Sequence, residues 1–171
     1  MKTLREYDIE IFRLSNKLHE FRYEFDDRFF ENFDNSLISK GNGTVELAIN
    51  KTTTLMELNF RLKGTIELIC DRSLEPFDFE INSERDLIIK FGDVDEELSD
   101  EISMIHWDTQ RINVAQYIYE FIGLEIPMKK LHPRFEDEGD QDEMIYQSEE
   151  NKTNEEDIDP RWEALKGLKN K

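Results

Sequence analysis

The turn Cys70-Asp71-Arg72-Ser73 has the spacing of a metal-binding knuckle but only one of the two thiols. In a Cys-x-x-Cys turn, two thiolates three residues apart can share one zinc ion. Here Ser73 occupies the second position, and a serine hydroxyl is a poor zinc ligand. Cys70 is the single cysteine of the chain, so an intramolecular disulfide and a cysteine-only metal cage are excluded. We expect Cys70 to be a small buried side chain before a tight polar turn, with no metal and no cofactor.

The other residue types that could perform catalysis form no motif. The three histidines, His19, His106 and His132, lack the close spacing of paired metal ligands. There is no Gly-x-Ser-x-Gly motif and no glycine loop that would hold a phosphate. Among 40 acidic residues, some carboxylates will look paired by chance. We therefore expect no enzymatic activity and no small-molecule substrate.

The charge of the chain is strongly negative and unevenly distributed. The net charge is −18, and without residues 136–159 the chain keeps 28 acidic and 21 basic residues. A negative field repels phosphate backbones and attracts basic partners, so RNA contact would need a local basic patch. Two clusters could supply one. They are Arg61 and Lys63 on one strand face with Arg72 in the adjoining turn, and Lys129, Lys130 and Arg134 further along.

The segment that follows is the most acidic part of the chain. Residues 136–159 contain twelve acidic residues and one base, Lys152. A segment so charged cannot bury enough apolar surface to offset its ordering entropy. We therefore expect three parts: a β-rich globular domain at residues 1–134, an acidic flexible linker at 135–158, and a short docking helix at 159–171.

The expected docking helix starts at Asp159 as N-cap, with Pro160 in the first helical position. Its apolar face would contain Trp162 and Leu165, beside Arg161. Tryptophan and arginine are enriched among interface anchors. A helix this short is marginal in water, so it needs a surface, which could belong to its own domain or to a partner.

Alternating apolar and polar residues predict most of the elements. Strands are expected at residues 4–14, 18–25, 44–50, 55–63, 65–70, 76–81, 87–91 and 102–107. Asp26 or Asp27 should cap a short helical turn, Gly41-Asn42-Gly43 should form a turn, and residues 92–101 an acidic loop. Asn113 should cap a helix of about eleven residues, because apolar residues recur with helical spacing after it.

These elements predict an α+β fold that is rich in β-structure. We expect an antiparallel sheet bent into a sandwich or open barrel, with one packed helix and the short C-terminal helix after the acidic linker. The expected aromatic contributors to the core are Phe60, Phe77, Phe79, Phe91 and Phe121. The first eight residues lack the apolar run of a signal peptide, and no apolar stretch approaches the ~20 residues that cross a bilayer. We expect a cytoplasmic protein without a membrane partner.

Three segments, in order, resemble a known family. They are Leu62–Phe77, Glu120–Met128 and Asp159–Leu165. Together, over roughly residues 43–168, they resemble the YceD-like family of large-ribosomal-RNA-subunit accumulation proteins, a bacterial and plastid domain. The resemblance implies a cytoplasmic factor needed for normal levels of 23S rRNA, acting in its processing or in assembly of the large subunit, with no catalytic chemistry.

One feature of the family is missing from this chain. Many members carry Cys-x-x-Cys-Leu in the turn and a further cysteine cluster after a Leu-x-Leu-Pro segment. This chain has Ser73 in the turn and no cysteine in residues 128–133. The resemblance therefore implies no zinc knuckle here.

Two hypotheses follow for function. The first is a noncatalytic ribosome-biogenesis factor whose partner is a pre-ribosomal large-subunit particle, contacted through 23S rRNA precursor or a basic ribosomal protein. The alternative is an acidic protein-binding module, a chaperone or nucleic-acid mimic, that binds a basic partner without RNA contact. Strand order is not readable from the sequence, so the oligomeric state stays open. The expected partner-binding residues are Arg61, Lys63, Cys70, Asp71, Arg72, Lys129, Lys130, Arg134, Asp159, Pro160, Arg161, Trp162 and Leu165.

Overall fold

The computed structural model describes residues 4–34 and 36–135. These residues belong to one compact unit, residues 1–136. The expected linker, apart from Phe135, and the expected docking helix lie outside the described residues.

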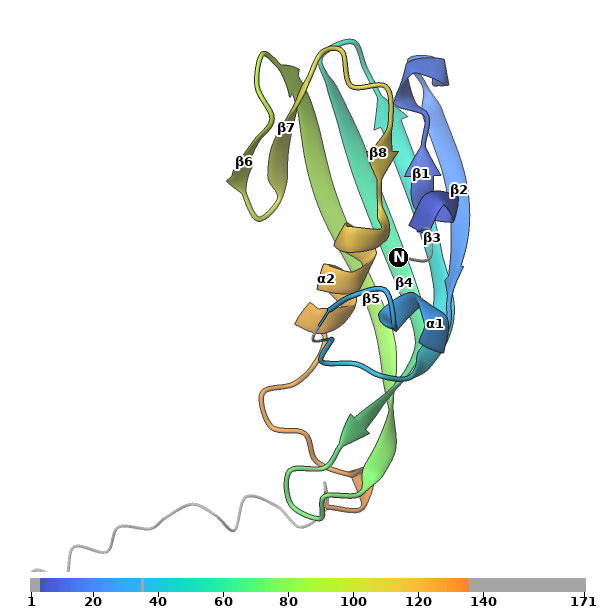
Figure 1. Cartoon of the computed structure of the whole chain (residues 1–171), viewed down its shortest axis with the longest axis vertical. Coiled ribbons are helices and arrows are strands. Elements are labelled where there is room, and N and C mark those ends of the chain that lie inside the picture. The colour runs from blue at the N-terminus through green and yellow to red at the C-terminus, as the bar shows by residue number, and fades with distance from the viewer. Residues whose placement is uncertain (1–3, 35, 136–171) are drawn as a thin grey trace, which may run out of the picture. The chain divides into compact units, whose positions relative to one another are not determined.

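A six-stranded sheet dominates this unit, in the order β2-β3-β4-β5-β7-β6 (Figure 1). Its strands are β2 (Leu18–Phe25), β3 (Gly41–Lys51), β4 (Leu55–Ile69), β5 (Pro76–Gly92), β6 (Glu96–Ser99) and β7 (Ile102–His106). Neighbouring strands are antiparallel except β5 and β7, which are parallel. The sheet is open, with β2 and β6 as its two edges.

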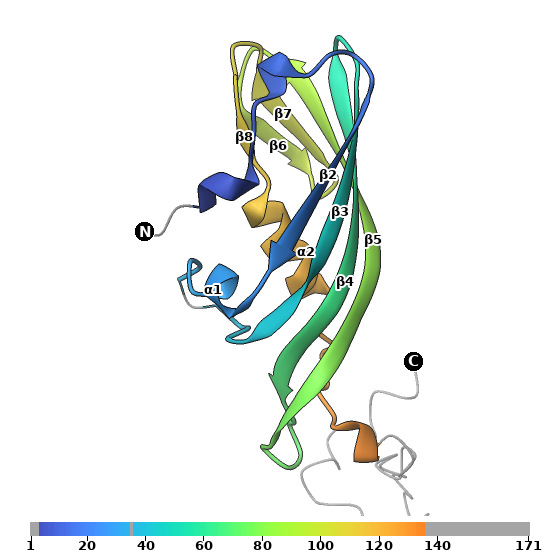
Figure 2. The same ribbon diagram turned by 90° about the vertical axis from the view of Figure 1, so that its right-hand side faces the viewer.

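Most of the remaining elements cover one side of this sheet. They are the two-stranded sheet of β1 (Asp8–Ile9) and β8 (Ile112–Asn113), the helices α1 (Asp27–Phe30) and α2 (Ala115–Leu124), and the 3-10 turns η1 (Leu4–Tyr7) and η2 (Ile11–Arg13). A third 3-10 turn, η3 (Pro133–Phe135), lies beside the end of the β4–β5 hairpin. Figure 2 shows β1, β8, α1 and α2 on the concave side of the large sheet. None of the helices in the described part of the chain is long and apolar enough to cross a membrane.

The core lies between α2 and the concave face, as the alternation predicts. On β3, Val45, Leu47 and Ile49 are buried while the residues between them are not. The rings of Phe60 on β4 and Phe121 on α2 meet at 5.1 Å in a T-shaped contact. Of the expected aromatic core residues, Phe60, Phe77 and Phe121 are buried, and Phe79 and Phe91 are partly buried against them. The expected β-rich α+β fold with one packed helix is confirmed.

Capping signals in the sequence predict the start of α1 at the pair Asp26–Asp27 and place the cap of α2 one residue too early, at Asn113 instead of Val114. Asp26 Oδ1 accepts hydrogen bonds from the N–H groups of Arg28 and Phe29, at 3.0 and 3.2 Å, and so starts α1. Asn113 lies in β8, one residue before the N-cap of α2, and its Oδ1 accepts from the Ala115 N–H at 3.0 Å. A short polar side chain before a helix thus satisfies N–H groups that lack an intrahelical partner.

Four local expectations were wrong. Residues 4–14 form η1, β1 and η2 instead of a strand, because only Asp8 and Ile9 find a partner strand, β8. Gly41–Gly43 begins β3 and is not a turn. The expected acidic loop at residues 92–101 contains β6. The sheet is mixed and not purely antiparallel, because β7 pairs with β5 in parallel.

Four of the expected strands join in pairs to form two long strands. The two expected before the turn at Cys70 form β4, and the two expected after it form β5. All of β4 pairs with β5, from Leu55 opposite Lys90 to Ile69 opposite Pro76. Figures 1 and 2 show this hairpin extending past the other strands, with the chain after α2 running beside it.

Candidate partner-binding surfaces

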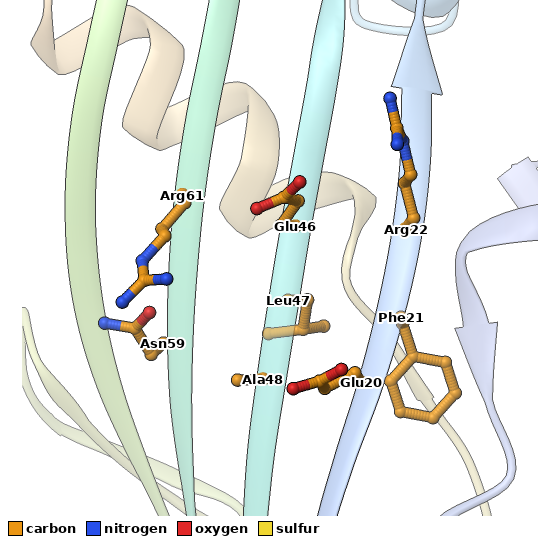
Figure 3. A pocket seen from close by; sticks show the side chains of 8 residues that line it. All are labelled: Glu20, Phe21, Arg22, Glu46, Leu47, Ala48, Asn59 and Arg61. Carbon is orange, nitrogen blue, oxygen red and sulfur yellow. The ribbon is translucent and has the colours of Figure 1, made fainter.

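Arg61 lies in a row of alternating charges on the outer face, defined here as the side of the large sheet opposite α2. The register places Arg22 opposite Glu46, Glu46 opposite Arg61, and Arg61 opposite Glu84. Opposite charges facing one another across strands stabilise a sheet. Figure 3 shows Arg22, Glu46 and Arg61 in this order on three neighbouring strands. Arg61 is therefore part of a balanced row and not of a basic patch.

The charge of Arg61 is balanced by Glu84, which also accepts a hydrogen bond from Asn59. The Nε of Arg61 lies 3.3 Å from Glu84 Oε1. Asn59 Nδ2 donates to Glu84 Oε1 at 2.7 Å and to Asp86 Oδ1 at 2.8 Å. These bonds, first from Asn59 and then from Arg61, lower the pKa of Glu84. The side chains in Figure 3 line a shallow hollow of about 360 Å³ beside this network.

Lys63 is exposed two residues further along β4, on the same face. Exposed carboxylates on this face include those of Glu57 on β4 and of Asp78, Glu80 and Asp86 on β5. A phosphate approaching Lys63 would meet this negative field, which disfavours the outer face as an RNA contact.

The second group of basic residues gathers at the end of the β4–β5 hairpin. We call this surface the hairpin tip: residues 70–75 of the turn together with residues 128–135, which pack against it. The Asp71 N–H donates to Lys130 O, and the Lys130 N–H donates to Asp71 Oδ2, both at 2.8 Å. The ammonium of Lys130 lies 3.6 Å from Asp71 Oδ1. Asp71 therefore holds the two segments together.

Two guanidinium groups share one aromatic ring at the hairpin tip. The Cζ atoms of Arg72 and Arg134 lie 4.6 and 4.8 Å from the centroid of the Phe135 ring. Arg134 also forms an ion pair with Glu75. Cations over an aromatic face are attracted by the ring quadrupole. The ring therefore positions both arginines although they are far apart in sequence.

The hairpin tip is basic in an acidic chain. Its two segments carry four basic residues, Arg72, Lys129, Lys130 and Arg134, against two acidic ones, Asp71 and Glu75. Arg72, Lys129 and Arg134 are exposed. The structure thus separates Arg72 from Arg61 and Lys63, with which the sequence grouped it, and places it in the second cluster.

The side chain of Cys70 lies inside the hairpin tip. Its side chain is buried, as expected, and its Sγ accepts a hydrogen bond from the His132 N–H at 3.3 Å. Burial favours the neutral thiol, but the polar groups around the sulfur, the Ser73 hydroxyl first and then the backbone of Ser73, His132 and Arg72, outweigh it and lower the pKa of Cys70 to about 7. Leu74 has a positive backbone angle, φ 58°, and its N–H donates to Cys70 O at 2.9 Å. The sulfur is therefore a structural acceptor within the hairpin tip.

The side chains around Cys70 do not fit a zinc knuckle. One thiol, the Ser73 hydroxyl and the nearby His132 fall short of the four cysteine and histidine ligands of structural zinc sites. Across residues 4–34 and 36–135, no three or more His, Cys, Asp or Glu side chains are grouped to hold a metal ion.

Sequence reasoning missed three members of this surface. His132 packs its ring on Phe77 at 5.7 Å, Phe135 holds the two arginines, and Glu75 pairs with Arg134. No local signal could identify them, because Phe77, Arg72 and Arg134, which they respectively contact, are far from them in the chain. The remaining predicted contact residues lie outside the described residues. They are Asp159, Pro160, Arg161, Trp162 and Leu165.

One protein-family model matches most of the chain. Residues 58–169, from β4 onward, match the family model described as "Large ribosomal RNA subunit accumulation protein YceD". The chain belongs to this family. Membership implies a role in the accumulation of large-subunit ribosomal RNA and assigns no enzyme class. Both segments of the hairpin tip lie within the match, whereas β1, β2 and β3 precede it. No curated protein and no solved structure matches the chain.

Proposed function

We propose that this protein is a noncatalytic cytoplasmic factor in ribosome biogenesis that contacts the precursor of 23S rRNA, in a pre-ribosomal large-subunit particle, through the hairpin tip. The observation that carries the proposal is the convergence of Arg72 with Lys129, Lys130 and Arg134. Arginine and lysine are the side chains that bind phosphate oxygens, and arginine does so with a planar group that also stacks.

The position of the hairpin tip suits this role. Arg61, in the charged row of the outer face, is eight residues from the end of β4, about 26 Å along an extended strand. Exposed charges are largely screened beyond ~8 Å at physiological ionic strength. The basic tip is therefore little affected by the Glu46 and Glu84 carboxylates. Exposed Leu74 and Met128 add apolar surface beside the basic groups.

The test is recovery of RNA with the tagged full-length protein from its own cells. A variant with Arg72→Ala, Lys129→Ala and Arg134→Ala should lose most of the 23S precursor that the wild type recovers. The matched control, Arg61→Ala with Lys63→Ala and Lys90→Ala, changes net charge equally on the outer face and should keep it. Unchanged recovery by the first variant, or equal loss by both, would overturn the assignment to the tip.

A second candidate is favoured by the outer face. Its exposed carboxylates on β4 and β5 would attract a basic ribosomal protein and repel RNA. Dividing each lysate into ribonuclease-treated and untreated halves separates the two. Recovery of large-subunit proteins that is lost on ribonuclease treatment supports the RNA contact. A basic protein that survives the treatment supports an acidic protein-binding module.

The C-terminal segment belongs to the same proposal. We propose that residues 136–158 link the folded domain, which includes Phe135, to a docking helix at residues 159–171, whose Trp162 and Leu165 contact the particle. Truncation after Ile158 should weaken recovery of the particle without changing the thermal stability of the domain. Full recovery by the truncated chain would remove this part of the proposal.

A further inference from the structure

The edge strand β2 has backbone groups directed away from the sheet. It pairs only with β3 among the strands of the described chain, and the Lys51 N–H donates to Lys17 O at 3.2 Å at one end of that ladder. In an antiparallel pair, hydrogen-bonded residues alternate with residues whose N–H and C=O point outward. Counting from Lys17, the residues that point outward are Leu18, Glu20, Arg22 and Glu24.

One independent hydrogen bond agrees with this assignment. The Tyr7 hydroxyl donates to Glu24 O at 2.7 Å, which requires that carbonyl to point away from β3. The outward groups of Glu20 and Arg22 therefore form the central part of an edge that a further strand can extend.

The side chains of β2 are complementary to a second copy of β2 in one register. An antiparallel pair with its two-fold axis at Glu20 would place Glu20 opposite itself, and an axis at Arg22 would place Arg22 opposite itself. With the axis at Phe21, each Glu20 faces Arg22 of the second copy. The outward backbone groups of Glu20 and Arg22 then form hydrogen-bonded pairs, and like charges directly opposite one another are avoided.

This register continues a pattern already present within each chain. The row Glu84, Arg61, Glu46, Arg22 alternates in charge across four strands and ends at the β2 edge. Glu20 of the second copy would extend the alternation by one strand. Phe21, partly exposed on the opposite face and stacked on Tyr23 at 6.4 Å, would meet its counterpart on the axis.

The other edge of the sheet does not offer the same complementarity. All four residues of β6 are exposed, and the acidic residues in and around it include Asp95, Glu96, Glu97 and Asp100. Charge of one sign on an edge strand opposes pairing with another such edge. A contact restricted to β2 is isologous, so it closes as a dimer and does not propagate.

We propose that two copies of this chain associate through antiparallel pairing of their β2 edges, with Phe21 on the two-fold axis, into one continuous sheet. The interface precedes residue 58, where the family match begins, and it is independent of the hairpin tip and of the proposed function. Both tips remain exposed in such a dimer, because β2 and the β4–β5 turn lie on different parts of the fold.

The test uses charge reversal and complementation. The full-length chain should sediment with twice its 20.5 kDa mass at micromolar concentration and physiological ionic strength. Glu20→Arg alone and Arg22→Glu alone each place like charges opposite one another at two symmetric positions. Each should raise the dissociation constant by roughly tenfold or more. An equimolar mixture should form a heterodimer, because position 20 of one variant then faces the opposite charge at position 22 of the other.

Controls separate the interface from general charge effects. Glu97→Arg, on the β6 edge, should leave the dimer intact, and circular dichroism should show that each variant keeps its fold. A monomeric wild type at these concentrations would overturn the proposal. It would also be overturned by dimers of both single variants, or by a mixture that stays monomeric.

Discussion

Gly43 of β3 lies directly opposite Gly64 of β4, and the ring of Phe25 occupies the space that their absent side chains leave. A Cβ on Gly43 would come within 2.4 Å of Phe25 Cζ and 2.5 Å of Lys63 O. A Cβ on Gly64 would come within 2.4 Å of Asn42 O. The close approach of the strands and the ring therefore requires both glycines. This contact explains why a Gly-Asn-Gly segment that is typical of a turn begins a long strand instead.

Adding a methyl group at this contact should destabilise the domain. We expect Gly64→Ala to lower the free energy of unfolding by about 1–3 kcal/mol, because backbone atoms must move to admit the Cβ. Urea denaturation followed by circular dichroism measures the effect. Gly123→Ala is the matched control: no atom lies within 4 Å of its added Cβ, and in a helix alanine should be stabilising by up to about 1 kcal/mol. A loss of stability at position 123, or none at position 64, would contradict this account.

Removing the Asp71 carboxylate should loosen the hairpin tip locally. In Asp71→Ala, the Lys130 N–H loses its acceptor at 2.8 Å and the Lys130 ammonium its nearby carboxylate. We expect faster hydrogen–deuterium exchange in residues 128–135 and a global loss of only about 1 kcal/mol, since the bond is exposed. Glu80→Ala on the outer face serves as the control. Equal exchange in both variants would show that Asp71 does not hold the segment.

The thiol of Cys70 should make stability depend on pH. Its pKa is about 7 in the folded protein against 9.0 for an ordinary thiol. Because the folded state binds the proton less tightly, the free energy of unfolding should rise as pH increases between these two values, and this gain should be absent below them. Urea denaturation under reducing conditions, repeated over this pH range, measures the slope. In Cys70→Ala the contribution should disappear, and an identical slope in both proteins would exclude it.

The cap of α1 should contribute measurably to stability. Asp26→Ala removes the acceptor of two backbone N–H groups and should cost about 1 kcal/mol. Asp26→Asn keeps an oxygen acceptor and should retain most of the stability. Thermal unfolding of the two variants beside the wild type gives the comparison. If alanine and asparagine behave alike, the side-chain hydrogen bonds do not stabilise α1.

Local patterns predicted the elements whose signals lie within a few residues. The strand at residues 18–25 was predicted with its observed bounds, because one face is partly buried, the other is exposed, and period-two alternation reflects that difference directly. The pair Asp26 and Asp27 predicted the start of α1, where Asp26 is the cap, since a cap interacts with the next two or three N–H groups. By contrast, residues 4–14 alternate imperfectly and do not form a strand, because pairing depends on a distant partner and only β8 is available.

By itself, the sequence determined the family of this protein, its β-rich α+β class, the buried thiol and the identity of the basic side chains that we propose as contacts with a partner. Tertiary structure alone decided that β7 pairs with β5 in parallel, that Arg72 meets Arg134 over one ring, and that β2 is an edge with alternating charges. The physical reason is the separation in sequence between the residues that interact. Alternation and capping are set by neighbours in the chain, whereas strand order and the two surfaces arise from contacts between residues far apart in the chain, which no local pattern encodes.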